Sequence, residues 1–211
     1  MKDFRNISTL IFDFGGVLIN LDLNQCILNL KKLGLENVEQ YLSNFGQKDF
    51  FLQFEKGQIE TAQFREEIRK LTPKQLTDAE IDAAWCSFLC DIPQEKLEML
   101  LELKKKFRIL MLSNTNPLHI EVSAAAEFEK VGKKRSDYFD KCYLSYEMKM
   151  AKPDVEIFQA ILESEKVLPS QCLFLDDGPK NLEQAKNLGF QTYLVSDNED
   201  LSFLLELAPS R

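Results

Sequence analysis

The sequence predicts an α/β fold in which a parallel sheet carries an all-helical insertion after its first strand. Three observations predict it. Residues 10–18 form an apolar run with one carboxylate, Asp13, followed closely by two glycines, which is typical of a strand buried on both faces. Residues 20–92 show only the helical spacing of apolar side chains. From Ile92 onward, helical and strand patterns alternate, as in the crossover units of a parallel sheet.

Length, charge and cysteine content exclude several classes of protein. A chain of 211 residues can form one well-buried core with a sizeable insertion, or two small domains. Its net charge of -8, without a block of Lys or Arg, argues against a nucleic-acid surface. No segment approaches the length of a membrane span, so no membrane partner is expected. Five cysteines spread along the chain fit a reducing compartment, and the expected location is cytoplasmic.

The insertion is expected to form a helical unit with its own small core. Asp22 or Asn24 can cap its first helix. Thr77 and Glu80 make a capping box for a later one. The apolar positions between these two helices include Val38, Tyr41, Leu42 and Phe45, followed by an aromatic cluster at Phe50, Phe51 and Phe54.

Strands and helices are expected in turn along the rest of the chain. Strands are predicted over 107–113, 141–146, 171–175 and 190–195. Helices are predicted over 97–104, after Asn116 with Pro117 at the first helical position, from Pro153, from Pro179, and over 201–207. Three of these helices therefore begin with a proline after a strand and a short polar stretch.

We expect the residues that bind ligands and carry out any reaction to lie in those polar stretches. In an open parallel sheet, the carboxyl ends of the strands and the amino ends of the following helices share one edge, where ligands bind. The residues expected on this edge are Asp13, Ser113, Asn114, Lys152, Asp176 and Asp177. Backbone N–H groups at the helix starts favour an anion there.

The charges on this edge indicate an anion and a cation. Lys152 precedes Pro153 at an expected helix N-cap, where its charge opposes the helix dipole by about 0.3 to 1 kcal/mol, so a negative group is expected beside it. The alternative is a lysine in solvent. Asp176 and Asp177 would repel each other and Asp13 without a divalent cation, and such hard oxygen ligands suit Mg²⁺. The alternative for the Asp pair is a turn with a helix cap.

Four motifs resemble, in order and spacing, those of the haloacid dehalogenase-like (HAD) hydrolase superfamily. They are Ile11–Val17, Leu112–Asn116, Lys152–Asp154 and Phe174–Asn181. The resemblance implies a Rossmann-like parallel sheet core, residues 1–19 and 93–211, with an all-helical cap, residues 20–92, inserted after the first strand. Within the superfamily, the chain looks most like sugar-phosphatase-like members. Residues 54–59 are similar to the cap of bacterial alpha-glucose-1-phosphate phosphatases.

The resemblance also implies a reaction and the residues for it. The reaction is Mg²⁺-dependent removal of phosphate from a small phosphorylated metabolite, such as a sugar 1-phosphate, through an aspartyl-phosphate on Asp13. Mg²⁺ would be held by Asp13, the backbone carbonyl of Gly15, and Asp177, with Asp176 bound directly or through water. The phosphoryl group would be bound by the Ser113 hydroxyl, the Asn114 backbone and Lys152, which would also neutralise developing charge.

Gly15 departs from the family pattern. Related phosphatases usually carry an Asp here, which protonates the leaving alcohol, a contribution worth a factor of about 10² to 10⁴. A substrate with a more acidic leaving group, such as an anomeric sugar hydroxyl, would need less help. Alternatively, Asp22 or Glu55 supplies the proton, although Asp22 is more typical of a helix N-cap.

Other functions remain open at this point. A HAD-fold protein without catalysis could bind phosphate and act through a partner. A phosphotransferase of mutase type would differ from a phosphatase only in the fate of the aspartyl-phosphate. Carbon–halogen hydrolysis needs no metal, so the Asp176-Asp177 pair argues against it. His119 is the only histidine, which excludes a His-based triad. It is expected to face solvent, although from the first turn of its helix it could also reach the substrate. The chain could be a monomer or a homodimer.

Overall fold

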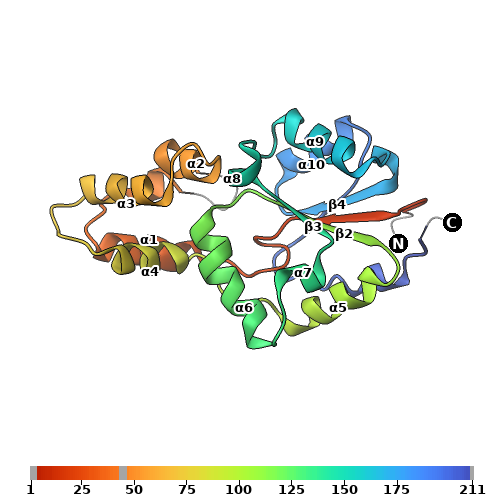
Figure 1. Ribbon diagram of the computed structural model, residues 1–211, viewed down its shortest axis with the longest axis horizontal. Helices are drawn as coiled ribbons and strands as arrows, with labels where there is room; N and C mark the ends of the chain where they lie inside the picture. The colour runs from red at the N-terminus through yellow and green to blue at the C-terminus, as the bar shows by residue number, and fades with distance from the viewer. Residues whose placement is uncertain (1–3, 43–46, 210–211) are drawn as a thin grey trace.

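The computed structural model describes residues 4–42 and 47–209, which contain one five-stranded parallel sheet (Figure 1). Its strand order is β3-β2-β1-β4-β5. The strands are β1 (Thr9–Phe12), β2 (Arg108–Ser113), β3 (Lys141–Leu144), β4 (Cys172–Asp176) and β5 (Gln191–Leu194). The predicted α/β fold with a parallel sheet is therefore confirmed. Within the described ranges, no helix is both long enough and apolar enough to span a membrane.

The pairing of the central strands brings three polar chain segments to one edge. Phe12 at the end of β1 is level with Met111 of β2 and Leu175 of β4. Asp13 comes next in the chain, and its N–H donates to the Leu175 carbonyl at 2.8 Å. Asp176 follows Leu175, so these two carboxylates leave adjacent strands at the same level. This register brings Asp13 and Asp176 to the same edge of the sheet.

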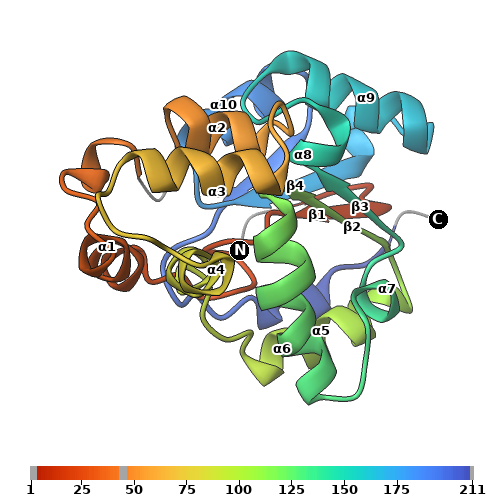
Figure 2. The ribbon, with the colours of Figure 1, turned by 60° about the vertical axis from the view of Figure 1, so that its left-hand side comes forward.

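The sheet separates two layers of helices (Figures 1 and 2). Leu10 and Phe12 of β1 belong to one apolar cluster and Ile11 to another, because successive strand side chains point to opposite faces. The first face is covered by α5 (Gln94–Lys104), α6 (Ala125–Lys130) and α7 (Arg135–Tyr138), and the second by α9 (Val155–Glu165) and α10 (Pro179–Asn187). Shorter elements are the π-helical turn η2 (His119–Ala124), α8 (Ser145–Met148), η3 (Pro169–Gln171) and η4 (Ser202–Glu206).

Helices of the insertion pack beside the sheet, at the left of Figure 1, around a third apolar cluster. They are α1 (Leu23–Lys32), η1 (Val38–Gln40), α2 (Asp49–Glu55), α3 (Thr61–Lys70) and α4 (Asp78–Cys86). Aromatic rings fill this cluster, with Phe54 stacked on Phe64 at 4.3 Å between ring centroids. Phe45, expected in this core, lies outside the described residues. The division of the chain at residues 20 and 92 remains a prediction.

Two helix caps in the insertion lie where the sequence predicts them. Asp22 is the N-cap of α1, and its Oδ1 accepts from the Gln25 N–H at 2.8 Å. Thr77 and Glu80 form the capping box of α4. Such local bonds depend only on residues three positions apart, so sequence alone can predict them.

The first strand ends at Phe12, so Asp13 lies where the strand ends and the turn begins, as predicted, and the Phe14 carbonyl accepts from the Leu18 and Ile19 N–H groups. Two predicted helices differ in the structure. The helix expected from Pro153 begins at Val155, since Lys152 and Pro153 lie in a turn. The last predicted helix is a 3-10 helix. Lys152 is therefore not a helix N-cap, and the predicted opposition between its charge and a helix dipole is wrong.

Candidate active site

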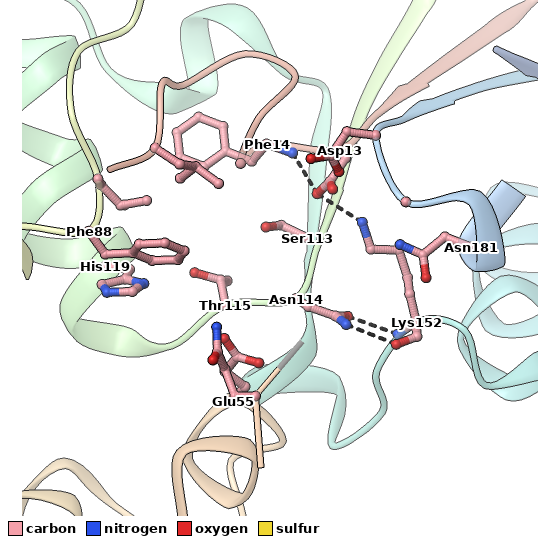
Figure 3. Close-up of a pocket in the computed structure, with 16 residues that line it drawn as sticks. Asp13, Phe14, Glu55, Phe88, Ser113, Asn114, Thr115, His119, Lys152 and Asn181 are labelled. Atoms are coloured by element: carbon pink, nitrogen blue, oxygen red, sulfur yellow. Dashed lines mark hydrogen bonds and ion pairs between the residues drawn. The ribbon is translucent and has the colours of Figure 1, made fainter. Parts of the chain in front are cut away.

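A pocket lies where the sheet edge meets the insertion (Figure 3). On the sheet side it is lined by Asp13, Gly15, Ser113, Asn114, Lys152 and Asp177. On the opposite side it is lined by residues of the insertion and of η2, among them Glu55, Phe88 and His119. The sequence-predicted residues thus come together at one place, although Asp176 is fully buried and does not itself line the pocket.

Lys152 lies between two carboxylates. Its Nζ is 2.8 Å from Asp13 Oδ1 and 2.7 Å from Asp176 Oδ2. Only 5% of the residue is exposed, so the alternative of a lysine in solvent is excluded. Burial on its own lowers the pKa of this ammonium group, but Asp13 and Asp176 outweigh burial and raise the pKa. Lys152 is therefore a fixed positive charge.

The loop that carries Lys152 is held by the side chain of Asn114. Asn114 Oδ1 accepts from the Lys152 N–H at 2.8 Å, and its Nδ2 donates to the Lys152 carbonyl at 2.9 Å. These two bonds join the end of β2 to the turn before α9. The lysine backbone is thus fixed relative to Ser113 and Asn114, whose positions at the end of β2 are set by the sheet.

Three carboxylates gather beside the lysine. Asp13, Asp176 and Asp177 can each offer one oxygen such that all three atoms lie within 4.8 Å of one another. Burial is the main cause that raises the pKa of Asp13 to about 8; Lys152 opposes it, and the charges of Asp176 and Asp177 add to it. Burial and Asp176 raise the pKa of Asp177 to about 6. A divalent cation would relieve this repulsion, and the all-oxygen donor set fits Mg²⁺.

Asp176 and Asp177 have different surroundings. Asp176 Oδ1 accepts from Gly178 N at 2.7 Å and Asn181 Nδ2 at 2.9 Å, and its Oδ2 accepts from Lys152. Its oxygens are therefore taken up by the protein, whereas Asp177 lines the pocket. Gly178 is also the N-cap of α10, so the turn considered as an alternative is present together with the carboxylate cluster.

His119 does not face solvent, so that expectation was wrong. It is 3% exposed, stacks on Trp85 with ring centroids 4.6 Å apart, and has Nε2 3.2 Å from the Trp85 carbonyl. Burial lowers the pKa of His119 to about 4, so the ring is neutral at neutral pH. Since Nε2 faces a carbonyl oxygen, it carries the proton, which leaves Nδ1 as an acceptor. The helix containing Trp85 covers this surface, which helical periodicity alone could not reveal.

Gln47 is a pocket residue that the sequence analysis missed. It is 8% exposed and lines the same pocket. It lies in an irregular segment just before α2, where neither periodicity nor a motif marks a residue as inward-facing. Only the packing of the insertion over the sheet edge brings it to the site.

Comparisons with known proteins agree with this architecture. A family model described as haloacid dehalogenase-like hydrolase matches residues 7–189. The D-ribitol-5-phosphate phosphatase of Bacteroides thetaiotaomicron is 36% identical over 194 residues, which cover 92% of this chain and 94% of that protein.

Solved structures give the same result. A mutant HAD family enzyme from Bacteroides thetaiotaomicron, in complex with magnesium and inorganic phosphate, matches with a TM-score of 0.90 and 46% identity, covering 94% of this chain and 98% of that one. A HAD-like family hydrolase from Porphyromonas gingivalis matches with a TM-score of 0.86 and 34% identity, covering 92% and 94%. The order of the four sequence motifs, the parallel sheet and these matches together place the chain in the haloacid dehalogenase-like hydrolase family.

Proposed function

We propose that this chain is a Mg²⁺-dependent phosphatase that releases phosphate from a small phosphorylated metabolite through a phosphoryl group carried on Asp13. The observation that carries the proposal is the arrangement of Asp13 beside Lys152, 2.8 Å away, with the oxygens of Asp177 close by. The relative named D-ribitol-5-phosphate phosphatase supports the same reaction class.

Two hydrogen-bond donors orient the Asp13 carboxylate for attack on phosphorus. The Phe14 N–H donates to Asp13 Oδ1 at 2.7 Å, and Lys152 Nζ contacts the same oxygen. Both donors fix the carboxylate through one oxygen, so the other is available to bond to phosphorus. Lys152 then lies where negative charge develops on the phosphoryl group. We assign the Ser113 hydroxyl and the Asn114 backbone to the phosphoryl oxygens.

Asp13, the Gly15 carbonyl and Asp177 would hold the metal ion, with Asp176 acting through water because its own oxygens already have protein donors. When bound, Mg²⁺ would reduce the repulsion between the carboxylate and the phosphate dianion. A related enzyme crystallised with magnesium and inorganic phosphate supports this choice of ion.

The proposed substrate is a phosphorylated polyol or sugar. The pocket wall opposite Asp13 offers the polar side chains of Glu55 and His119, together with the ring of Phe88. Hydroxyl groups of the substrate can form hydrogen bonds with Glu55 and His119, and its carbon-bound hydrogens can pack on the ring of Phe88. D-Ribitol 5-phosphate, a primary alkyl phosphate, is the first candidate because of the named relative. A sugar 1-phosphate, with its better leaving group, is the second, as the absence of a side chain at Gly15 suggests.

Phosphate release from a panel of phosphate esters tests the proposal. We expect turnover of at least one polyol or sugar phosphate with added Mg²⁺ and none in EDTA. The panel should contain D-ribitol 5-phosphate, several sugar 1-phosphates and the aryl ester p-nitrophenyl phosphate. No turnover of any ester would contradict the proposal and favour a phosphate-binding protein. Transfer of labelled phosphate to a second sugar, instead of to water, would indicate a phosphotransferase.

Gly16→Ala is expected to lower kcat/KM by about 10²-fold through displacement of Asp177. Gly16 has a φ of +71°, and a Cβ there would lie 2.4 Å from Asp177 Oδ2. Gly132→Ala is a matched control, since Gly132 has a φ of +69° but no atom within 4 Å of an added Cβ. Both variants carry the strain of a positive φ, about 1 kcal/mol. Only Gly16→Ala should lose activity, and equal losses would mean that backbone strain alone matters.

A further inference from the structure

The proposed phosphatase reaction, on which this inference rests, requires a proton for the leaving group, and no residue has yet been assigned to supply it. A phosphate ester of a sugar or polyol releases an alkoxide, which is a poor leaving group unless it is protonated as the P–O bond breaks. Gly15, two residues beyond Asp13, has no side chain that could donate. Lys152 is held between two carboxylates, and it lies on the nucleophile's side of the pocket (Figure 3). The donor must come from the opposite wall.

Glu55 is a buried carboxyl on that wall. It is the last residue of α2, lines the pocket and is 5% exposed. Its carboxyl has no hydrogen-bond or ion-pair partner among residues 4–42 and 47–209. Burial raises the pKa of Glu55 to about 8, although the charge of Lys152 opposes the shift. The group therefore carries a proton at neutral pH, and nothing in the described chain uses that proton.

The position of Glu55 suits an in-line reaction. Phosphoryl transfer places the attacking and leaving oxygens roughly opposite each other across phosphorus. In Figure 3, Glu55 lies across the pocket from Asp13, with Ser113 and Asn114 between them. A phosphoryl group bound to Ser113 and Asn114 and attacked by Asp13 would therefore direct its leaving oxygen towards Glu55.

Ser145 fixes Glu55 relative to the phosphate side of the pocket. The Ser145 hydroxyl donates to the Glu55 carbonyl at 2.6 Å and accepts from the Thr115 N–H at 2.8 Å. Thr115 directly follows Asn114. The backbone of Glu55 is thus joined through one fully buried side chain to the segment that holds the phosphoryl group.

The other candidate donors fail on geometry. Asp22 caps α1 through its Oδ1 and does not line the pocket. His119 has its single ring proton on Nε2, which faces the Trp85 carbonyl. We propose that Glu55, supplied by the helical insertion, is the general acid that protonates the leaving oxygen and takes the place of the side chain missing at Gly15.

The two steps balance as follows. Asp13 forms a bond to phosphorus, the bond from phosphorus to the alcohol oxygen breaks, and that oxygen keeps the electron pair and takes the Glu55 proton. Water then attacks the phosphorus, gives its proton to the Glu55 carboxylate, and the bond to Asp13 breaks with its electron pair returning to the Asp13 carboxylate. The products are the alcohol and inorganic phosphate, and Glu55 is again protonated.

The test compares two leaving groups in Glu55→Gln. The first measurement is the steady-state turnover of D-ribitol 5-phosphate, or of the best alkyl phosphate in the panel. The second is the pre-steady-state burst of p-nitrophenol from p-nitrophenyl phosphate. Glu55→Gln should lower kcat for the alkyl ester by about 10² to 10⁴-fold. The burst rate should change less than about threefold, because p-nitrophenolate leaves without a proton. Glu55→Asp, which keeps an acid on a shorter side chain, should recover part of the alkyl activity.

Controls separate this inference from its alternatives. Glu36→Gln, at an exposed position of the insertion, should match the wild type on both esters, and thermal unfolding should show that all variants are folded. Equal losses on both esters, or a rise in KM with kcat unchanged, would overturn the general-acid role and make Glu55 a substrate-binding residue. Failure of the wild type on every ester would instead contradict the proposed function itself.

Discussion

Asp13→Asn is expected to reduce phosphate release by about 10⁴-fold or more on every ester, including those with good leaving groups. The amide oxygen can still accept from the Phe14 N–H at the position of Oδ1, but a neutral amide cannot bond to phosphorus as a carboxylate does. The loss should appear in kcat and in the burst of p-nitrophenol alike. Steady-state rates and the burst on the purified variant are the measurements.

The fold of Asp13→Asn should be preserved. Asn has the volume of Asp, and the buried acid it replaces has a raised pKa, so its ionisation opposes folding at neutral pH. The thermal midpoint in EDTA is therefore expected to be unchanged or higher. Asp22→Asn is the matched control, because Asn caps a helix as well as Asp; it should keep full activity. Residual turnover near the wild-type level in Asp13→Asn would refute Asp13 as the nucleophile.

Lys152→Met is expected to lose both activity and stability. Methionine fills much of the same space but leaves Asp13 and Asp176 buried without their shared cation. Removal of one partner of a buried ion pair costs about 3 to 5 kcal/mol. Loss of the charge that faces the phosphoryl group should lower kcat by about 10² to 10³-fold. Denaturant unfolding and kcat at saturating substrate measure the two effects.

A second substitution distinguishes these two effects. In Lys152→Met/Asp176→Asn one of the unpaired carboxylates is removed, so the free energy of unfolding should partly recover while activity stays low. Lys96→Met is the control for a buried lysine elsewhere: its Nζ donates to the Val17 carbonyl at 2.6 Å, away from the pocket. It should keep its activity even if it loses stability. An active Lys152→Met would show that this charge has no part in the reaction.

Much of the sheet and its catalytic edge could be predicted because the relevant signals are local. Three of the four short motifs each combine a buried strand with the polar residues directly after it, and the parallel register then brings Asp13 level with Asp176. The caps at Asp22 and Thr77 involve residues three positions apart. In each case the physics that fixes the residue acts within one element or between paired strands.

The far wall of the pocket could not be predicted in the same way. Gln47 and His119 face the site only because the insertion packs over the sheet edge, and the side of a helix that meets a neighbour depends on that packing. Sequence could name Glu55 as one of two possible acids but could not choose it over Asp22. Lys152 was expected at a helix start, whereas the Asn114 side chain holds it in a turn before the helix.

The end of α2 is tied to the sheet side by three contacts close together in sequence. Ser145 bonds to the Glu55 carbonyl, Lys56 lies 3.0 Å from Asp154, and Lys149 donates to the Gly57 carbonyl at 2.5 Å. Outward rotation of α2 would break these contacts together and carry the Glu55 carboxyl away from the leaving oxygen. The alignment of the proposed acid with the leaving oxygen therefore depends on these few polar contacts between the insertion and the rest of the chain.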